Sequence, residues 1–399
     1  MSNDTRPEIR FPGFTEDWEE RKLIDLVVRL NKSTNSSRLP KVEFEDIVAG
    51  EGRLNKDVSQ KFDNRKGIEF LPNDILYGKL RPYLKNWLKA TFTGVAIGDF
   101  WVFRAKKSDS DFIYSLIQAD RYQKAANDTS GTKMPRSDWK KVSDTVFYIP
   151  NDLKEQQKIG IFFKKLDDTI ALHQRKLDLL KETKKGFLQK MFPENGAKVP
   201  EIRFPGFTED WEERKLGELG KTQSGIGFPD AEQGGSEGTP FFKVSDMNNI
   251  GNEYEMRNAN HYVSNEQIER KKWKPIKDVP AIIFAKVGAA IMLNRKRLVT
   301  SPFLIDNNTM AYLFNNTWDI YFGKILFETI YLPRYSQVGA LPSYNSSDIE
   351  NISVKVPVKD EQQKIGTFFK QLDDTIALHQ RKLDLLKETK KSFLQKMFV

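Results

Sequence analysis

The chain has 399 residues, a formal net charge of +9, 39% hydrophobic residues and no cysteine. This length suits about two or three domains with packed cores, and the lack of cysteine excludes disulfides and thiolate metal sites. The start lacks the apolar core of a signal peptide, and no apolar run approaches membrane-spanning length. We therefore expect a cytoplasmic protein without membrane contact, and the positive charge favours a polyanionic partner.

Two segments of the chain occur twice. Residues 7–23, PEIRFPGFTEDWEERKL, recur without change at 200–216, and residues 155–192 recur at 361–398 with three differences. The regions between the copies are not alike, and the second is 13 residues longer. This arrangement predicts a pseudo-twofold tandem, in which constant frames carry two modules that recognise different things.

Residues 24–154 form the first variable region. Its short apolar and aromatic runs are broken by Gly, Pro, Asn and Asp, which predicts strands joined by turns; the runs are VEFEDIVAG, IEFLPNDILYGKL, GVAIGDFWVFRA and VSDTVFYIP. A helix is expected around Asp111 to Ala125. Together these elements indicate a mixed domain of strands and helix.

The segment 155–192 predicts one long amphipathic helix. Its core positions are spaced alternately by four and three residues, which is typical of a heptad seam. Asp152 is expected to cap this helix, with Glu155 as its capping-box partner. The seam consists of Ile159, Phe163, Leu166, Ile170, His173, Leu177, Leu180, Lys184, Phe187 and Met191. Two such helices in one chain favour pairing with each other; the alternative is a helix packed on the side of a globular domain.

The second copy, 361–398, repeats this seam, and Asp360 with Gln363 is the expected capping pair. Its seam consists of Ile365, Phe369, Leu372, Ile376, His379, Leu383, Leu386, Lys390, Phe393 and Met397. His173 and His379 lie almost at the midpoints of the two copies. If the helices pair antiparallel with full overlap, these two side chains should meet near the pseudo-twofold axis and fix the register.

Residues 217–360 repeat the plan of the first variable region with PFFKVSDM, AIIFAKVGAAIML, MAYLF and ISVKVP. Three short correspondences support a shared fold with different surfaces. They pair Ile75–Lys79 with Ile282–Lys286, Gly131–Pro135 with Gly339–Pro342, and Tyr148–Pro150 with Lys355–Pro357. The Pro- and Gly-containing linker 193–200 joins the two halves.

Catalytic patterns are hard to find. Residues 217–222, GELGKT, resemble the end of a phosphate-binding loop, but Lys215 stands where the first glycine is required. The three histidines show no metal-ligand spacing, and there is no serine nucleophile elbow and no Asn- or Asp-Pro-Pro-Tyr box of an adenine methyltransferase. We therefore predict a binding protein that holds no metal, has no catalytic residue and binds no cofactor.

Basic and aromatic residues cluster in both variable regions. Arg and Lys can contact phosphates or read guanine, so these clusters predict a DNA-binding face. The candidates are Lys79, Arg81, Tyr83, Lys85, Lys133, Arg136, Lys286, Arg295, Lys296, Arg297, Arg334 and Tyr335. The alternative is ordinary exposed charge. The two repeated helix segments carry a formal +7 between them, for which a solvated helix face is the usual explanation.

These strings together resemble the specificity (S) subunits of type I restriction–modification systems, and staphylococcal-type members most. The resemblance rests on both constant segments, on LPNDILYGKLRPYLKNW at 71–87 and on the GTKMP turn, and it covers the whole chain. The second variable region departs from the pattern at 286–291, where KLRPYL is replaced by KVGAAI.

The resemblance implies an α+β fold: two mixed α/β target recognition domains with antiparallel strands, separated by two long antiparallel coiled-coil helices. We place the first domain with its constant segment at 1–154 and the central helix at 155–192. The linker, repeated segment and second domain occupy 193–360, and the C-terminal helix occupies 361–399.

The resemblance also implies a non-catalytic role in a larger complex. Each domain would read one half of a bipartite double-stranded DNA target, and the paired helices would set the spacer and dock two methyltransferase subunits. Two restriction subunits would complete the complex. S-adenosylmethionine, ATP and magnesium would be bound by these partners, and this chain would hold no cofactor. Two other classes remain open: a fused modification enzyme with unrecognised motifs, and a protein-binding scaffold without DNA recognition.

Overall fold

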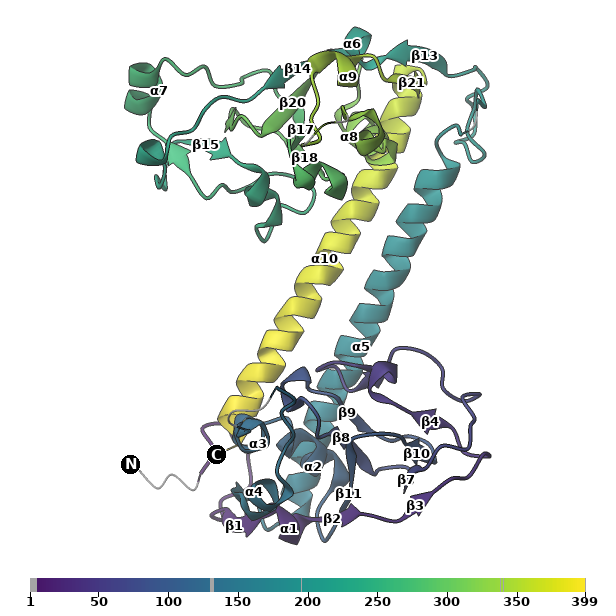
Figure 1. Cartoon of the computed structure of the whole chain (residues 1–399), viewed down its shortest axis with the longest axis vertical. Helices are drawn as coiled ribbons and strands as arrows, with labels where there is room; N and C mark the ends of the chain where they lie inside the picture. The colour runs from purple at the N-terminus through teal and green to yellow at the C-terminus, as the bar shows by residue number, and fades with distance from the viewer. Residues whose placement is uncertain (1–5, 130–132, 195, 338, 340, 399) are drawn as a thin grey trace. The chain divides into compact units, whose positions relative to one another are not determined.

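The computed structural model consists of two units, residues 1–176 with 379–399, and residues 177–378 (Figure 1). Each unit, called unit 1 and unit 2 below, holds one variable region and a part of each long helix. The structure describes residues 6–129, 133–194, 196–337, 339 and 341–398. None of the described helices is long and apolar enough to cross a membrane.

The main sheet of unit 1 has four antiparallel strands. Their order is β2 (Val27–Leu30), β11 (Phe100–Ala105), β8 (Ile75–Gly78) and β9 (Trp87–Lys89). Side chains of successive residues point to opposite faces, and both faces of this sheet are covered. Ile75 and Tyr77 join a core with the helices of the unit, whereas Leu76 and Val102 join a second core.

A second sheet and several short elements complete the variable domain of unit 1. The sheet order is β3 (Ser33–Thr34), β7 (Gly67–Phe70), β10 (Gly94–Ala96) and β4 (Lys41–Val42), with only the β10–β4 pair parallel. The short elements are α1 (Leu23–Leu26), η1 (Phe44–Asp46), β5 (Ile47–Val48), β6 (Arg53–Leu54), η2 (Pro82–Leu84) and α4 (Trp139–Asp144). Antiparallel pairing therefore dominates, as the sequence predicts.

The helix expected over 111–125 is in fact two helices, α2 (Ser110–Leu116) and α3 (Asp120–Asn127). The backbone of Ala119 is extended (φ −68°, ψ 151°), and its N–H donates to the Leu116 carbonyl in a tight turn that ends α2. The prediction of one helix was wrong because the hydrophobic pattern continues through the turn: Ile117 and Ala119 are both buried.

Unit 2 repeats the main sheet with the same topology. Its order is β14 (Gly220–Ser224), β20 (Thr309–Phe314), β17 (Ala281–Ala285) and β18 (Lys296–Val299). A smaller sheet has the order β16 (Tyr262–Val263), β15 (Thr239–Phe242) and β19 (Leu304–Ile305). The remaining elements are α6 (Leu216–Leu219), η3 (Asp230–Glu232), η4 (Val244–Asn248), α7 (Asn265–Lys271), η5 (Ala289–Leu293), α8 (Ile320–Thr329), η6 (Leu332–Tyr335) and α9 (Ser346–Glu350).

The constant segments are tied to the ends of the variable domains. In unit 1, β1 (Glu19–Lys22) pairs antiparallel with β12 (Val146–Ile149). In unit 2, β13 (Glu212–Lys215) pairs in the same way with β21 (Ser353–Val356). The chain therefore enters and leaves each variable domain at two strands that pair with each other.

The two long helices are α5 (Leu153–Lys190) and α10 (Lys359–Met397). In unit 1 they run antiparallel, because Asp167 of α5 contacts Lys390 of α10 and His173 contacts His379. In unit 2, Lys184 of α5 likewise contacts Asp373 of α10. The predicted antiparallel pairing is confirmed, and the alternative of a helix packed beside one globular domain is excluded.

The predicted helix starts need correction. Both helices begin two residues before the expected starts. Asp152 does lie at the cap of α5 and accepts a hydrogen bond from the Lys154 N–H (2.8 Å). Asp360, however, lies inside the first turn of α10, and the Glu155 carboxylate binds Arg10 instead of closing a capping box. Every predicted seam residue is buried or half-buried.

Candidate nucleic-acid interface

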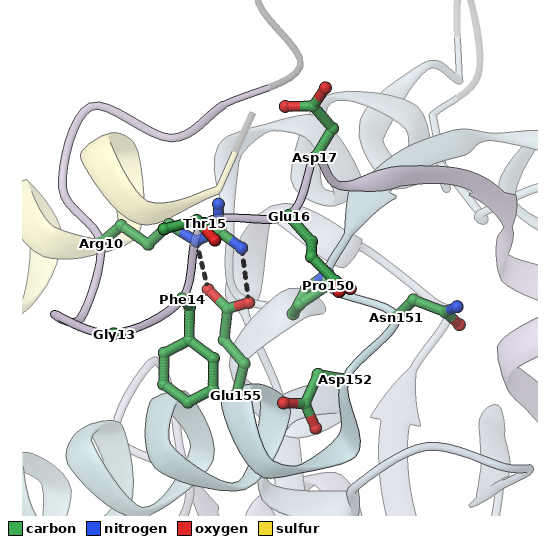
Figure 2. Close-up of a pocket in the computed structure, with 10 residues that line it drawn as sticks. All are labelled: Arg10, Gly13, Phe14, Thr15, Glu16, Asp17, Pro150, Asn151, Asp152 and Glu155. Carbon is green, nitrogen blue, oxygen red and sulfur yellow. Dashed lines mark hydrogen bonds and ion pairs between the residues drawn. The ribbon is translucent and has the colours of Figure 1, made fainter.

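The constant segment of each unit is anchored to the start of a long helix by an arginine. In unit 1, Arg10 Nε and Nη2 donate to the two carboxylate oxygens of Glu155 at 2.7 and 2.8 Å (Figure 2). The repeated Arg203 binds Glu361 with the same two distances in unit 2. Both carboxylates are fully buried. A bidentate arginine is suited to this position because it satisfies both oxygens of a buried carboxylate.

The same constant segments also reach the end of the other long helix. The Ile9 N–H donates to the Lys396 carbonyl in unit 1 (3.2 Å), and the Ile202 N–H donates to the Lys190 carbonyl in unit 2 (2.8 Å). Each unchanged 17-residue copy therefore contacts the start of one long helix and the end of the other in its own unit. This explains why the sequence is held constant there, and it gives both variable domains an equivalent mounting.

The structure brings together the two basic clusters of unit 1 that are far apart in the sequence. The Arg81 N–H donates to the Pro135 carbonyl (2.7 Å), and Leu80 forms a β-bridge with Arg136. The side chains of Lys79 and Arg136 then meet at one carboxylate, that of Asp99, at 3.6 and 2.9 Å. These residues form one surface, which we call the basic face of unit 1.

The exposed end of this basic face is formed by Arg81, Tyr83 and Lys85. Their side chains make no hydrogen bond or ion pair with the described part of the chain. Arg81 has φ +48°, in the left-handed region that disfavours most side chains. A strained, exposed arginine with free donors is a good candidate for a ligand contact. Lys133 is exposed beside the same surface, whereas Gly131 and Thr132 of its turn lie outside the described residues.

Unit 2 has an equivalent surface around Lys286. The Gly288 N–H donates to the Pro342 carbonyl and the Tyr344 N–H to the Lys286 carbonyl, at 2.9 and 3.0 Å, in the pattern seen around Arg81. Gly288, with φ +85°, stands where unit 1 has Arg81. The predicted correspondence of the two turns is therefore found, although Ala340 lies outside the described residues. The departure at 286–291 removes the arginine but keeps the backbone path.

The three consecutive basic residues of unit 2 have different surroundings. Lys296 Nζ donates to the Ile330 carbonyl (2.5 Å), and burial lowers the pKa of Lys296 to about 8. The guanidinium of Arg297 donates to backbone carbonyls, and burial lowers its pKa as well. Arg295 binds the Asn248 side chain at the surface. Contact with DNA remains a prediction for all three, and Arg295 is the one whose partner is exposed.

The last predicted pair, Arg334 and Tyr335, lies on η6. The Arg334 guanidinium stacks over the Tyr335 ring at 4.7 Å and donates to its hydroxyl (2.5 Å). Arg334 is exposed, so this pair presents a flat cationic surface. Stacking of this kind leaves other guanidinium donors free for a phosphate or a base edge.

Sequence reasoning missed a cleft in unit 1 that is lined by lysines and carboxylates. A cavity of about 350 Å³ is lined by Lys85 of the basic face and by three lysines of α10, Lys387, Lys390 and Lys391. Lys387 contacts Glu51 at 3.1 Å, and Lys390 contacts Asp167 at 2.5 Å. No sequence signal joins Lys85 to lysines some 300 residues later in the chain; only the fold places them in one cleft. Among the described residues, no acidic or histidine cluster could hold a metal ion.

Comparison with known proteins identifies the family. The sequence model described as "Type I restriction modification DNA specificity domain" matches residues 15–182 and again residues 208–388. The chain belongs to the type I DNA specificity family. Each of the two matches contains part of one constant segment, one variable region and most of one long helix. The family consists of specificity subunits, which are generally non-catalytic, and its tandem domains suit a bipartite DNA site.

Relatives of this specificity family cover most of the chain. The type I restriction enzyme MjaVIII specificity subunit of Methanocaldococcus jannaschii is 24% identical over 314 residues, which span 72% of this chain and 68% of the relative. The crystal structure of an S subunit from M. genitalium has a TM-score of 0.67 at 15% identity and covers 99% of both chains. A chain solved in work on complex assembly and conformational transition of the type I R-M system has a TM-score of 0.52 at 17% identity, covering 94% of this chain and 96% of that one. The last two likenesses support the fold alone.

Proposed function

We propose that this specificity subunit reads a bipartite double-stranded DNA target, one half with the variable domain of unit 1 and the other half with that of unit 2. The observation that supports this most is that the basic face of unit 1 and the surface around Lys286 in unit 2 have equivalent places in their domains. Lys79 and Lys286 occupy the same position in two domains that are mounted on identical constant segments. Different side chains around one shared backbone path are what two different half-sites require.

The proposed complex contains two methyltransferase and two restriction subunits. In it, S-adenosylmethionine, ATP and magnesium are bound by the partners, and this chain supplies no cofactor and no catalytic residue. Apolar side chains on the constant helices support docking. Leu172 and Leu385 of unit 1, and Leu179 and Leu378 of unit 2, are 45–63% exposed. They occupy repeated positions, so two copies of one partner would find the same contacts. A cytoplasmic location follows from a chromosomal DNA partner.

The central test exchanges residues 24–154 for the equivalent region of another specificity subunit. The chain is expressed with its methyltransferase partner, and the methylated DNA motif is mapped. One half of the motif should change and the other half should stay the same. A change in both halves would contradict the proposal that each variable domain recognises one half-site independently. Methylation, cleavage or ATPase turnover by the purified chain alone would contradict its non-catalytic role.

We further propose that the paired helices set the spacer between the half-sites. Helix α5 has 38 residues, which corresponds to a length of about 57 Å at about 1.5 Å per residue. That length spans about 17 base pairs, and access from one side of the duplex favours about one helical turn between half-sites. Inserting one helical turn into both helices should lengthen the accepted spacer. An unchanged spacer would mean that the helices do not measure it.

A further inference from the structure

Each variable domain meets its constant helix at the start of one of its own helices, α2 in unit 1 and α8 in unit 2. Both helices begin after an aspartate cap. The Asp109 carboxylate accepts a hydrogen bond from the Phe112 N–H, and the Asp319 carboxylate accepts one from the Phe322 N–H, both at 2.9 Å. Over the ten positions from each cap, the two sequences otherwise share only a leucine. The Asp-x-x-Phe start is therefore the common feature of two dissimilar helices.

A buried glutamine of the constant helix forms a hydrogen bond with each of these helix starts. In unit 1, Gln156 Oε1 accepts from the Asp109 N–H (3.0 Å), and its Nε2 donates to the Pro150 carbonyl (2.9 Å). In unit 2, Gln362 makes the same two bonds with Asp319 and Pro357, at 2.9 and 3.0 Å. The partners in the variable domain are all backbone groups. Any sequence supplies such groups, so one glutamine can serve unlike domains.

One turn further along the constant helix, a glycine gives the aspartate cap its space. A Cβ atom on Gly160 would lie 2.6 Å from Asp109 Oδ1 and 2.7 Å from the Phe112 nitrogen. On Gly366 it would lie 2.2 Å from Asp319 Oδ1 and 2.9 Å from the Phe322 nitrogen. These neighbours are a backbone atom and a carboxylate held by its capping bond. A larger residue would therefore have to displace the start of the whole helix.

The phenylalanine of each start packs on a phenylalanine that follows the end of the other constant helix. The ring centroids of Phe112 and Phe398 are 5.6 Å apart in unit 1, and those of Phe322 and Phe192 are 5.7 Å apart in unit 2. Phe192 and Phe398 are the same position of the two constant copies. Each Asp-x-x-Phe start thus contacts both constant helices of its unit.

A second contact fixes the far end of the same variable helix. Lys390 Nζ binds Gln118 at 2.6 Å as well as Asp167, and Lys184 Nζ binds Glu328 at 2.6 Å as well as Asp373. The lysines and aspartates belong to the constant copies, whereas Gln118 and Glu328 follow α2 or lie on α8. Because each variable helix is held at both ends, its rotation relative to the constant helices is restricted.

We propose that the Gln and Gly of the constant helix form a common attachment site, called the socket below, for the Asp-x-x-Phe start of a recognition domain. This contact holds the domain at one orientation, and different domains can use it. The socket accepts domains that carry an aspartate cap with phenylalanine three residues later. This proposal rests on the proposed function. It assigns a positioning role to Asp109, Gln156 and Gly160 and to their counterparts in unit 2. They select the spacing of the half-sites without touching DNA.

The test introduces Gly160→Ala into the full chain together with its methyltransferase partner. Binding is measured to DNA duplexes that keep both half-sites but vary the spacer by single base pairs. The preference for the best spacer over its neighbours should fall by about tenfold, equivalent to about 1.4 kcal/mol, while the bases preferred within each half-site stay unchanged. The matched control is Gly186→Ser: it is a glycine of the same helix with no atom near its Cβ position, and the other copy has Ser392 there.

Two comparisons keep the outcomes distinct. Gln156→Glu retains the size of the side chain but replaces the donor to the Pro150 carbonyl by an acceptor, so it should also broaden the spacer preference even if Gly160→Ala fails to fold. Equal spacer profiles in Gln156→Glu, Gly160→Ala and Gly186→Ser, or weakening by the same factor at every spacer, would overturn the socket. If the unaltered complex did not prefer the bipartite duplex to a scrambled one, the proposed function itself would fail.

Discussion

His173 Nδ1 and His379 Nδ1 lie 3.1 Å apart, with ring centroids at 5.3 Å. The two residues occupy the same position of the two constant copies. Their contact confirms the register expected from the midpoints of the repeats. One ring must donate and the other accept, so at least one of them is neutral.

This contact predicts a pH-dependent seam. Burial, then the neighbouring His173, and then Lys382 and Lys176 lower the pKa of His379. A lowered pKa means that the unfolded chain binds more protons than the folded one, so the free energy of unfolding should fall as pH falls through the histidine range. We expect a smaller fall between about pH 7.5 and pH 5.5 in a His173→Leu, His379→Leu double variant. Denaturant titrations at both pH values check this; equal pH slopes in the two proteins would contradict it.

The Arg10–Glu155 anchor gives a second prediction. Arg10→Ala leaves a buried carboxylate without its partner, which should destabilise unit 1 by about 3 kcal/mol. Arg6→Ala is the matched control, because the Arg6–Asp17 pair is exposed on both sides and such pairs contribute about 0–1 kcal/mol. Urea unfolding midpoints compare the two. Replacing both partners, Arg10→Met with Glu155→Gln, should recover much of the loss; no recovery would show that the arginine acts through other contacts.

The repeats let the sequence predict the frame well. An alternation of four and three over 38 residues identifies both helices and their seams, two equal helices favour pairing with each other, and the family resemblance adds that they run antiparallel. Capping was less predictable. Glu155 has the spacing of a capping-box residue, yet a bidentate arginine 145 residues away provides a stronger partner. The local capping pattern therefore does not form, because Glu155 binds a residue that is distant in the sequence.

The clustering of basic residues was predictable in composition but not in detail. Lys79 and Arg136 stood in separate clusters, and the structure joins them across a β-bridge. Arg295, Lys296 and Arg297 looked alike as three consecutive cations. The fold separates them, because the carbonyl that holds Lys296 belongs to Ile330, and the tertiary course of that loop cannot be inferred from charge spacing.

A third prediction concerns Arg81 on the basic face of unit 1. Arg81→Gly removes the side chain and supplies a residue that adopts positive φ without strain, as Gly288 does at the equivalent position of unit 2. If Arg81 reads a base, the change should cost about 1–3 kcal/mol and relax one position of one half-site. Lys107→Gly is the control, since Lys107 is also exposed at positive φ, +52°. Fluorescence anisotropy with single-base variants of the duplex checks this. Equal affinities for Arg81→Gly and Lys107→Gly would remove Arg81 from the interface.

The fourth prediction concerns Lys296, whose ammonium group is held inside unit 2. Burial lowers its pKa to about 8, whereas an unfolded lysine titrates near 10.4. Between these two values the unfolded chain binds more protons, so the free energy of unfolding rises as pH rises from about 8 to about 10 and is lowest below that window. Lys296→Met should therefore raise the free energy of unfolding at pH 7 by on the order of 1–2 kcal/mol and flatten this alkaline slope.

The same variant also tests whether Lys296 contacts DNA. The Ile330 carbonyl keeps a donor in the Asn294 amide, at 3.4 Å, so Lys296→Met need not leave it unpaired. If the ammonium only supports the fold, DNA affinity and its salt dependence should stay the same as in the control Lys277→Met, which alters an exposed lysine. A phosphate contact would instead weaken binding to all sequences alike and reduce the slope of affinity against salt by about one counterion. Measuring affinity at three salt concentrations separates these outcomes, because only the loss of a phosphate contact changes the slope of affinity against salt.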